Sequence, residues 1–151
     1  IIGTHAAHDP EFIQIAAETF GSSTIAVCID VKKKFLKGQR VYTRGGSHLT
    51  EFSPVEFAKL MEEMGAGEII IQSVEKDGAM TGYDIDLIKS ISEAVSIPVV
   101  ALGGAGNSAD LKKAWKEGFA NGLAAGSMFV FTGTKRGVLI NYPEKGEVFG
   151  G

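Results

Sequence analysis

The first candidate for chemistry is a carboxylate at the end of an apolar run. Asp30 closes the stretch TIAVCID, residues 24–30, in which mostly apolar residues lead directly into a charge. Partial burial at the end of a strand can move the pKa of a carboxyl group into the range in which it acts as a general acid or base. A turn or capping aspartate would produce the same pattern, so position alone leaves both interpretations open.

The second candidate is a long, charged loop, SVEKDGAMTGYD, residues 73–84. Connections between strands and helices in α/β folds usually take only about 2–6 residues. In this loop Asp77 could accept hydrogen bonds from a ligand while the amide of Gly78 donates one to a phosphate. An Asp-Gly pair also occurs in simple turns, so it is weak evidence by itself.

Two glycine-rich loops form the third candidate. The first begins with Gly103 and Gly104, and the second contains Gly126 and Ser127. Each follows a predicted strand and precedes a predicted helix, so a ligand can approach the bare main chain and the N–H groups at a helix N-terminus favour a phosphate. Two such loops on consecutive strands match the phosphate site that (β/α)8 barrels often build after strands seven and eight. Neither loop fits the P-loop or the dinucleotide-binding pattern.

Other chemistries find little support. His5, His8 and His48 form no metal-binding pattern with one another or with Cys28, so we expect no bound metal and no cofactor. The single cysteine excludes an internal disulfide, and we expect it to be a small buried side chain.

Composition excludes further classes of protein. The formal net charge is −3, and the run KKK at 32–34 is the only basic cluster, which argues against nucleic acid as a partner. No apolar stretch approaches the roughly 18 residues of a membrane span, and the N-terminus is not a signal peptide, so we expect no membrane partner and a cytoplasmic location.

The length of 151 residues indicates one domain. The chain lacks an initiator methionine and opens on what reads as the end of a strand, which suggests part of a longer protein.

These candidate residues are positioned by alternating strands and helices. The strands are predicted at residues 1–3, 24–30, 68–73, 98–102 and 123–125, with a short strand or hairpin around 39–43; the helices are predicted at 11–20, 54–64, 85–95 and 108–117, with one or two more between 126 and 143 and an irregular tail over 143–151. Strands that are apolar on both faces and alternate with helices indicate a parallel sheet covered by helices. About four and a half such units are either part of a closed eight-stranded barrel, which takes about 250 residues, or a small open sheet.

Three long segments carry a specific resemblance. The stretches GAGEIIIQSVEKDGAMTGYDIDLIKSI, IPVVALGGAGNSADL and AAGSMFVF resemble the second half of the cyclase subunit of imidazole glycerol phosphate synthase, and TFGSSTIAVCIDVKK extends the match. The resemblance covers nearly the whole chain and implies an α/β fold, the (β/α)8 TIM barrel. This chain, residues 1–151, would supply the end of strand four through strand eight.

The resemblance also implies roles for individual residues. Asp30 matches the second of two catalytic aspartates; the first lies on strand one, outside this chain. The loops that match the family's site for the distal phosphate of the substrate contain Asp77, Gly78, Gly103, Gly104, Gly126 and Ser127. Glu68 matches a charged residue near the entrance for ammonia from a glutaminase partner. In the family's reaction, ammonia joins a phosphoribulosyl aminoimidazole-carboxamide ribonucleotide, which is cleaved as the imidazole ring closes during histidine synthesis.

Several positions depart from the family pattern. Gly3 replaces an asparagine, Leu102 replaces a small polar residue, and SVEKDG stands where SIDRDG is common. The segments GSMFVF and VLINYP are similar to a paralogous branch associated with amidation of a nucleotide-linked sugar for surface polysaccharides. A noncatalytic phosphate-binding module is the third possibility. In each case we expect the other half of the barrel, or another copy, to cover the open strand edges.

Overall fold

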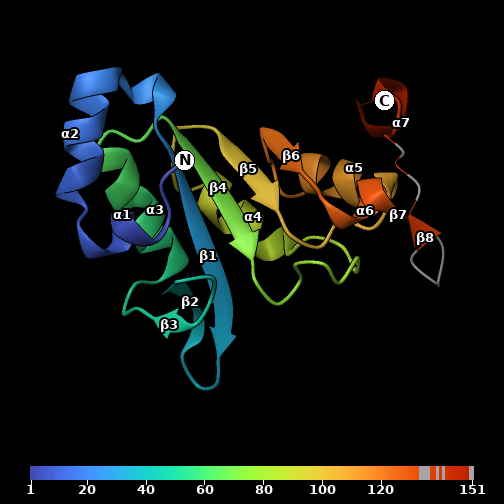
Figure 1. Cartoon of the computed structure of the whole chain (residues 1–151), viewed down its shortest axis with the longest axis horizontal. Helices are drawn as coiled ribbons and strands as arrows, with labels where there is room; N and C mark the ends of the chain where they lie inside the picture. Colours follow the sequence, from blue (N-terminus) through green and yellow to red (C-terminus); the bar gives the residue numbers. More distant parts are fainter. Residues whose placement is uncertain (133–136, 139, 141, 150–151) are drawn as a thin grey trace.

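The structure is a computed structural model that describes residues 1–132, 137–138, 140 and 142–149. Its main sheet has six strands in the order β3-β2-β1-β4-β5-β6, and a small hairpin of β7 and β8 lies near the C-terminus (Figure 1). The strands are β1 (Ala26–Lys34), β2 (Gly38–Thr43), β3 (His48–Leu49), β4 (Glu68–Ser73), β5 (Val99–Leu102), β6 (Gly122–Ala124), β7 (Phe131–Thr132) and β8 (Gly137–Val138). The helices are α1 (Thr4–His8), α2 (Glu11–Phe20), a 3-10 turn η1 (Ser22–Thr24), α3 (Pro54–Glu63), α4 (Ile85–Ser92), α5 (Ser108–Lys116), α6 (Ser127–Val130) and α7 (Lys145–Phe149).

The central part of the sheet is parallel. β1, β4, β5 and β6 pair in that order, and a helix lies between each strand and the next: α3, α4 and α5. Ile2 adds a parallel bridge to Val27 on the other side of β1, where the sequence predicted the end of a strand. The alternation of strands and helices is the one predicted, and its carboxyl-terminal strand ends all lie along one edge of the sheet.

One face of this sheet forms the core with the helices. Val27, Ile29, Ile69, Ile71 and Val99 on the strands are at most 1% exposed. They pack against buried side chains of the covering helices, which are Ile13 on α2, Phe57 and Met61 on α3, and Leu87 and Ile91 on α4. Alternate residues of a strand point to opposite faces of the sheet, so the strand residues between these buried ones point to the other face.

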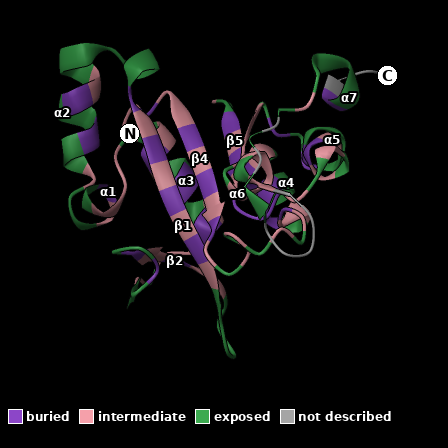
Figure 2. Cartoon of the chain, turned by 45° about the vertical axis from the view of Figure 1, so that its right-hand side comes forward, coloured by how far each residue is buried: buried purple, intermediate pink, exposed green. Residues whose placement is uncertain are grey.

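The opposite face of the parallel strands is only partly covered. Cys28, Ile70, Val100 and Leu102 occupy the alternate positions and are all of intermediate exposure. The colouring of β1 and β4 by burial shows the same alternation along both strands (Figure 2). This half-buried apolar face is called the open face below.

Two predicted boundaries were wrong. β1 does not end at Asp30 but continues to Lys34, because its last residues pair with the antiparallel strand β2 as far as the pair Lys34 and Gly38. The helices predicted between 126 and 143 reduce to α6, which is followed by the pairing of Phe131 with Val138. The aromatic and β-branched residues there favour strands, and residues 133–136, 139 and 141 lie outside the described part.

The tail was predicted to be irregular over 143–151, but its described part contains helix α7. Val148 on this helix is 5% exposed and packs in the cluster that includes Leu111 and Ala114 of α5. Tertiary burial of one side chain therefore accounts for a helix that has no periodic pattern in the sequence. Among the described residues, no helix is long and apolar enough to cross a membrane.

Candidate functional site

The strand register brings Asp30 to the carboxyl-terminal edge of the sheet even though its own strand continues. Asp30 pairs with Gln72, Gln72 pairs with Leu102, and Leu102 pairs with Ala124. Directly paired residues in parallel strands project from the same face, so these four side chains form one row on the open face. Gln72, Leu102 and Ala124 lie at or next to the ends of their strands.

The environment of Asp30 suits a proton-transferring carboxyl group. Partial burial raises the pKa of Asp30, and the negative charge of Asp77 raises it further. The Sγ atom of Cys28 lies 4.0 Å from Oδ1 of Asp30. Burial, with a smaller effect of the Asp30 charge, raises the pKa of the Cys28 thiol to about 11, so the thiol is neutral at physiological pH. Cys28 is half-buried rather than fully buried as the sequence predicted.

Gln72 is a polar residue of this site that the sequence analysis missed. Its Nε2 atom donates a hydrogen bond to Oδ2 of Asp77 at 3.3 Å, and its strand neighbour in the row is Asp30. The sequence signal for Gln72 was its amide side chain, which follows three isoleucines directly in EIIIQS. Gln72 therefore stands between the two carboxylates and orients one of them.

The three loops predicted to hold a phosphate meet in one pocket. The pocket lies beyond the strand ends and is small, with a cavity volume of about 20 Å³. Its lining residues are Asp77, Gly78, Leu102, Gly103, Gly104, Ala105, Ala125, Gly126 and Ser127. All six predicted phosphate-binding positions are among them, together with Leu102.

Two glycines bring these loops into close contact. Gly103 has φ +89°, and a Cβ atom at this position would lie 2.9 Å from the carbonyl oxygen of Ser73. Gly104 has φ +112°, and a Cβ atom there would collide with the carbonyl oxygen of Gly82. Only glycine combines a positive φ with so close a contact at no steric cost, which explains why two glycines follow β5.

The two helices that follow the glycine loops differ at their N-termini. In α5, Asn107 accepts hydrogen bonds from the amides of Ala109 and Asp110, while the Asp110 carboxylate accepts from the amides of Gly106 and Asn107. These amides are therefore taken by the chain itself, contrary to the prediction that both helix N-termini offer them to a ligand. At α6, by contrast, no described side chain caps the N-terminus, which begins after Gly126.

The loop between β4 and α4 connects the walls of the pocket. The amide of Gly82 donates to the carbonyl oxygen of Gly104 at 2.8 Å. Nζ of Lys76 donates to the carbonyl oxygens of Gly82 and Tyr83, and the hydroxyl of Tyr83 donates to the carbonyl oxygen of Ala124 at 2.8 Å. Burial raises the pKa of Tyr83, with a smaller contribution from the charge of Asp110, so its hydroxyl stays protonated and can donate.

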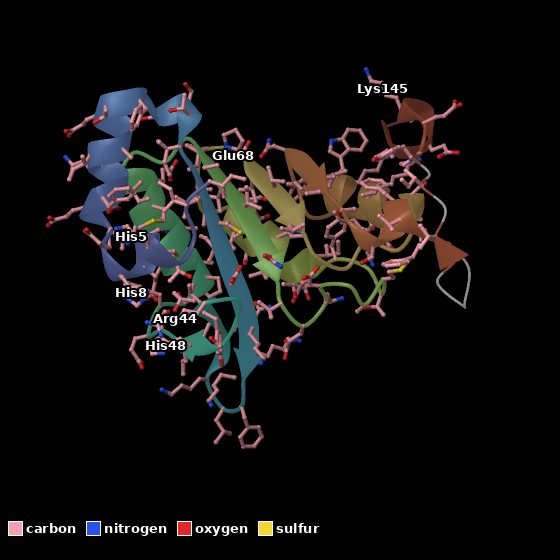
Figure 3. All side chains as sticks on the ribbon, in the orientation of Figure 1. His5, His8, Arg44, His48, Glu68 and Lys145 are labelled. Carbon is pink, nitrogen blue, oxygen red and sulfur yellow. The ribbon has the colours of Figure 1, made fainter. Side chains whose placement is uncertain are left out.

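The remaining predicted residues lie away from this pocket. Glu68 begins β4 at the end of the strand opposite to Ser73, and Figure 3 shows it at that amino-terminal end. His5, His8 and His48 gather on the side formed by α1 and β3 (Figure 3), where the rings of His8 and His48 are 6.4 Å apart. The described residues contain no group of three or more His, Cys, Asp or Glu side chains placed to hold a metal ion.

Comparisons with known proteins point in one direction. The model of the family described as "Histidine biosynthesis protein" matches residues 1–135. Over 143 residues, the chain is 41% identical to a Pseudomonas aeruginosa protein named "Putative imidazole glycerol phosphate synthase subunit hisF2". The match covers 95% of this chain and 57% of that protein, so the chain spans little more than half the length of this relative.

Proposed function

The chain belongs to the histidine biosynthesis protein family, and from this premise we propose that it is part of the cyclase subunit of a glutamine amidotransferase. The fold of the family is a (β/α)8 barrel, and the bridge at Ile2 with the four parallel strands corresponds to the end of its strand four through strand eight. The predicted fold class and family resemblance are thereby confirmed.

The proposed reaction uses ammonia from a glutaminase partner. It converts the phosphoribulosyl aminoimidazole-carboxamide ribonucleotide to imidazole glycerol phosphate in histidine biosynthesis, in the cytoplasm. The observation that carries the proposal is the convergence of three loops on one pocket beside the row of Asp30 and Gln72. A phosphate held there would fix the substrate relative to a carboxyl group with a raised pKa, and such positioning lowers the barrier to reaction.

Each part of the pocket has a separate role in this proposal. The phosphate oxygens lie against the backbone of Gly103 and Gly104 and against that of Gly126 and Ser127, because main-chain N–H groups favour an anion. Asp77, itself a carboxylate, accepts hydrogen bonds from substrate or chain rather than facing the phosphate charge. Asp30 donates or removes the proton at the reacting carbon or nitrogen. Ammonia would enter at the opposite end of the strands, where Glu68 lies.

One observation favours a second candidate substrate. Leu102 lines the pocket directly beside Gly103, so an apolar side chain stands next to the proposed phosphate position. This residue supports the alternative of a paralogous subunit that delivers ammonia to a nucleotide-linked sugar in surface polysaccharide synthesis. Both candidates use the same carboxylate and the same anion pocket, so only the substrate distinguishes them.

A direct assay tests both candidates. The full-length protein is supplied with ammonium ions at alkaline pH and offered either the histidine-pathway ribonucleotide or a nucleotide-activated acetamido sugar. We expect turnover of the ribonucleotide, and turnover of the sugar alone would establish the alternative. Turnover of neither, with retained phosphate binding, would support a noncatalytic binding module.

The variant Asp30→Asn tests the assigned acid–base residue. We expect it to lower kcat by a factor of about 100 or more, because general acid–base catalysis typically contributes 10²–10⁴-fold, while substrate affinity changes little. Asp86→Asn is the matched control, since Asp86 is exposed on the first turn of α4 and undergoes the same chemical change. An Asp30→Asn protein as active as Asp86→Asn would refute the assignment.

A further inference from the structure

The strand end that precedes the last phosphate loop is held by a side chain from a distant part of the chain. Tyr83 lies in the loop before α4, and its hydroxyl donates to the carbonyl oxygen of Ala124 at 2.8 Å across 41 residues of sequence. Ala124 is the last residue of β6, and only Ala125 separates it from Gly126 and Ser127. The position of Tyr83 therefore bears directly on where these two residues stand.

The ring of Tyr83 is fixed independently of this hydrogen bond. Tyr83 is 4% exposed and packs with Ile88 of α4, Leu111 of α5 and Ala101 of β5. A phenylalanine would fill the same space and make the same apolar contacts. The hydroxyl group adds only the bond to Ala124, so packing alone does not account for a tyrosine here.

The residue next to Tyr83 holds the second wall of the pocket. The amide of Gly82 donates to the carbonyl oxygen of Gly104, and Lys76 closes the loop by donating to the carbonyl oxygens of Gly82 and Tyr83. The third wall, Asp77 and Gly78, belongs to the same loop. Residues 82 and 83 thus connect all three loops that line the pocket.

We propose that Tyr83 is a positioning residue for phosphate binding: its hydroxyl fixes the end of β6 so that Gly126 and Ser127 face Asp77–Gly78 at the separation a phosphate group requires. The inference rests on the proposed phosphate site and extends it to a residue that does not line the pocket. β6 has only three residues in the described structure, so one side-chain hydrogen bond at its end contributes strongly to the position of the strand. Without that bond, the loop of Gly126 and Ser127 samples positions in which its amides no longer converge with those of the other two loops.

The test compares two variants of the full-length protein. Tyr83→Phe removes only the hydroxyl. Ile91→Val is the matched control, because Ile91 is fully buried on α4, does not line the pocket, and loses one methylene on substitution. Titration with inorganic phosphate gives the Kd of each protein, and steady-state kinetics with the accepted phosphorylated substrate give KM and kcat separately.

We expect Tyr83→Phe to raise the phosphate Kd and the KM roughly threefold to tenfold, which is the effect of losing one neutral hydrogen bond, while kcat stays within about twofold. Ile91→Val should lower the melting temperature without changing Kd or KM. Equal Kd and KM values for the two variants would overturn the inference about Tyr83. The proposal that the pocket binds phosphate would still stand. A wild-type protein that does not bind phosphate would overturn the proposed function and this inference together.

Hydrogen exchange provides a second readout that does not depend on a ligand. In the unliganded protein, Tyr83→Phe should speed amide exchange over residues 124–130 and leave exchange in α3 unchanged. Lys76→Met removes the bonds to the carbonyl oxygens of Gly82 and Tyr83, and we expect it to raise the phosphate Kd in the same direction. Exchange rates over residues 124–130 that are unchanged in Tyr83→Phe would refute the inference, because they would show that the hydroxyl does not hold the end of β6.

Discussion

At the scale of single residues, the proposed acid–base role of Asp30 depends on its surroundings. The charge of Asp77 and partial burial both disfavour the ionised form of Asp30, and Gln72 donates a hydrogen bond to Asp77. Asp30 therefore keeps its proton to a higher pH than an ordinary aspartate, while the hydrogen bond from Gln72 fixes the direction of the Asp77 side chain. A carboxyl group with a raised pKa is suited to the general acid or base role proposed for Asp30.

The raised pKa of Asp30 predicts a pH-dependent effect on stability. The unfolded carboxyl group titrates near 3.8 and the folded one at a higher pH, so the folded state binds more protons between the two values and wild-type stability falls as pH rises through this window. Asparagine carries no charge to bury. We therefore expect Asp30→Asn to raise the free energy of unfolding at pH 7 and to have no such advantage below pH 3.8.

Urea unfolding of wild type and Asp30→Asn at pH 7 and at pH 3.5 measures this difference. The same comparison with Asp86→Asn controls for the chemical change at an exposed site. A stabilisation by Asp30→Asn that is equal at both pH values, or a loss of stability at pH 7, would contradict the assigned cause of the raised pKa.

At the scale of elements, glycine decides how closely the loops approach. Gly104 follows β5 with φ +112° and faces the carbonyl oxygen of Gly82. The amide of Gly82 donates to the carbonyl oxygen of Gly104 itself, so the two loops are joined at a point where no side chain fits. This contact positions the loop of Gly103 and Gly104 against the loop of Asp77.

Gly104→Ala should therefore lower both stability and phosphate affinity. We expect a loss of about 1–3 kcal/mol in the free energy of unfolding, the usual cost of a strained backbone conformation, and a weaker phosphate Kd. Gly146→Ala is the control, because a Cβ atom at Gly146 on α7 meets nothing within 4 Å. Denaturant unfolding and phosphate titration measure both effects, and a Gly104→Ala protein that behaves like Gly146→Ala would show that the contact with Gly82 is not required.

The elements also show how far local sequence patterns reach. Ser53 and Glu56 form a capping box at the start of α3: the Ser53 hydroxyl accepts from the Glu56 amide, and the Glu56 carboxylate accepts from the Ser53 amide. This contact spans three residues, so the sequence contains all of it. The continuation of β1 beyond Asp30 depends instead on pairing with β2, and α7 depends on the burial of Val148, which no local pattern reveals.

At the scale of the whole molecule, the sheet has two faces with different partners. The helices bury one face, whereas the open face with Cys28, Ile70 and Val100 is half-exposed in the chain. In a closed barrel these side chains point into the interior, where the strands of the other half complete the packing. The 57% coverage of the Pseudomonas aeruginosa relative agrees with a chain that supplies one part of such a barrel.

The 151-residue chain studied alone should reveal this open face. We expect it to bind a hydrophobic dye and to self-associate in sedimentation velocity experiments, because exposed apolar strands and unpaired strand edges promote association. Val100→Lys should reduce both effects without unfolding the chain. Val99→Lys is the matched comparison, since Val99 is fully buried on the helix-covered face and a lysine there should unfold the protein. A monomeric wild-type chain that binds no dye would contradict this description of the face.

The sequence by itself determined the order and type of most helices and strands, the capping of α3 and the glycine-rich loops that line the pocket, because short-range patterns and glycine content specify them. Only the tertiary structure decided that Asp30 and Asp77 influence each other and that Tyr83 holds Ala124. The contacts of Asp30 and Tyr83 join residues 41 or more positions apart. They depend on strand register and side-chain direction, which packing of the whole sheet against its helices settles.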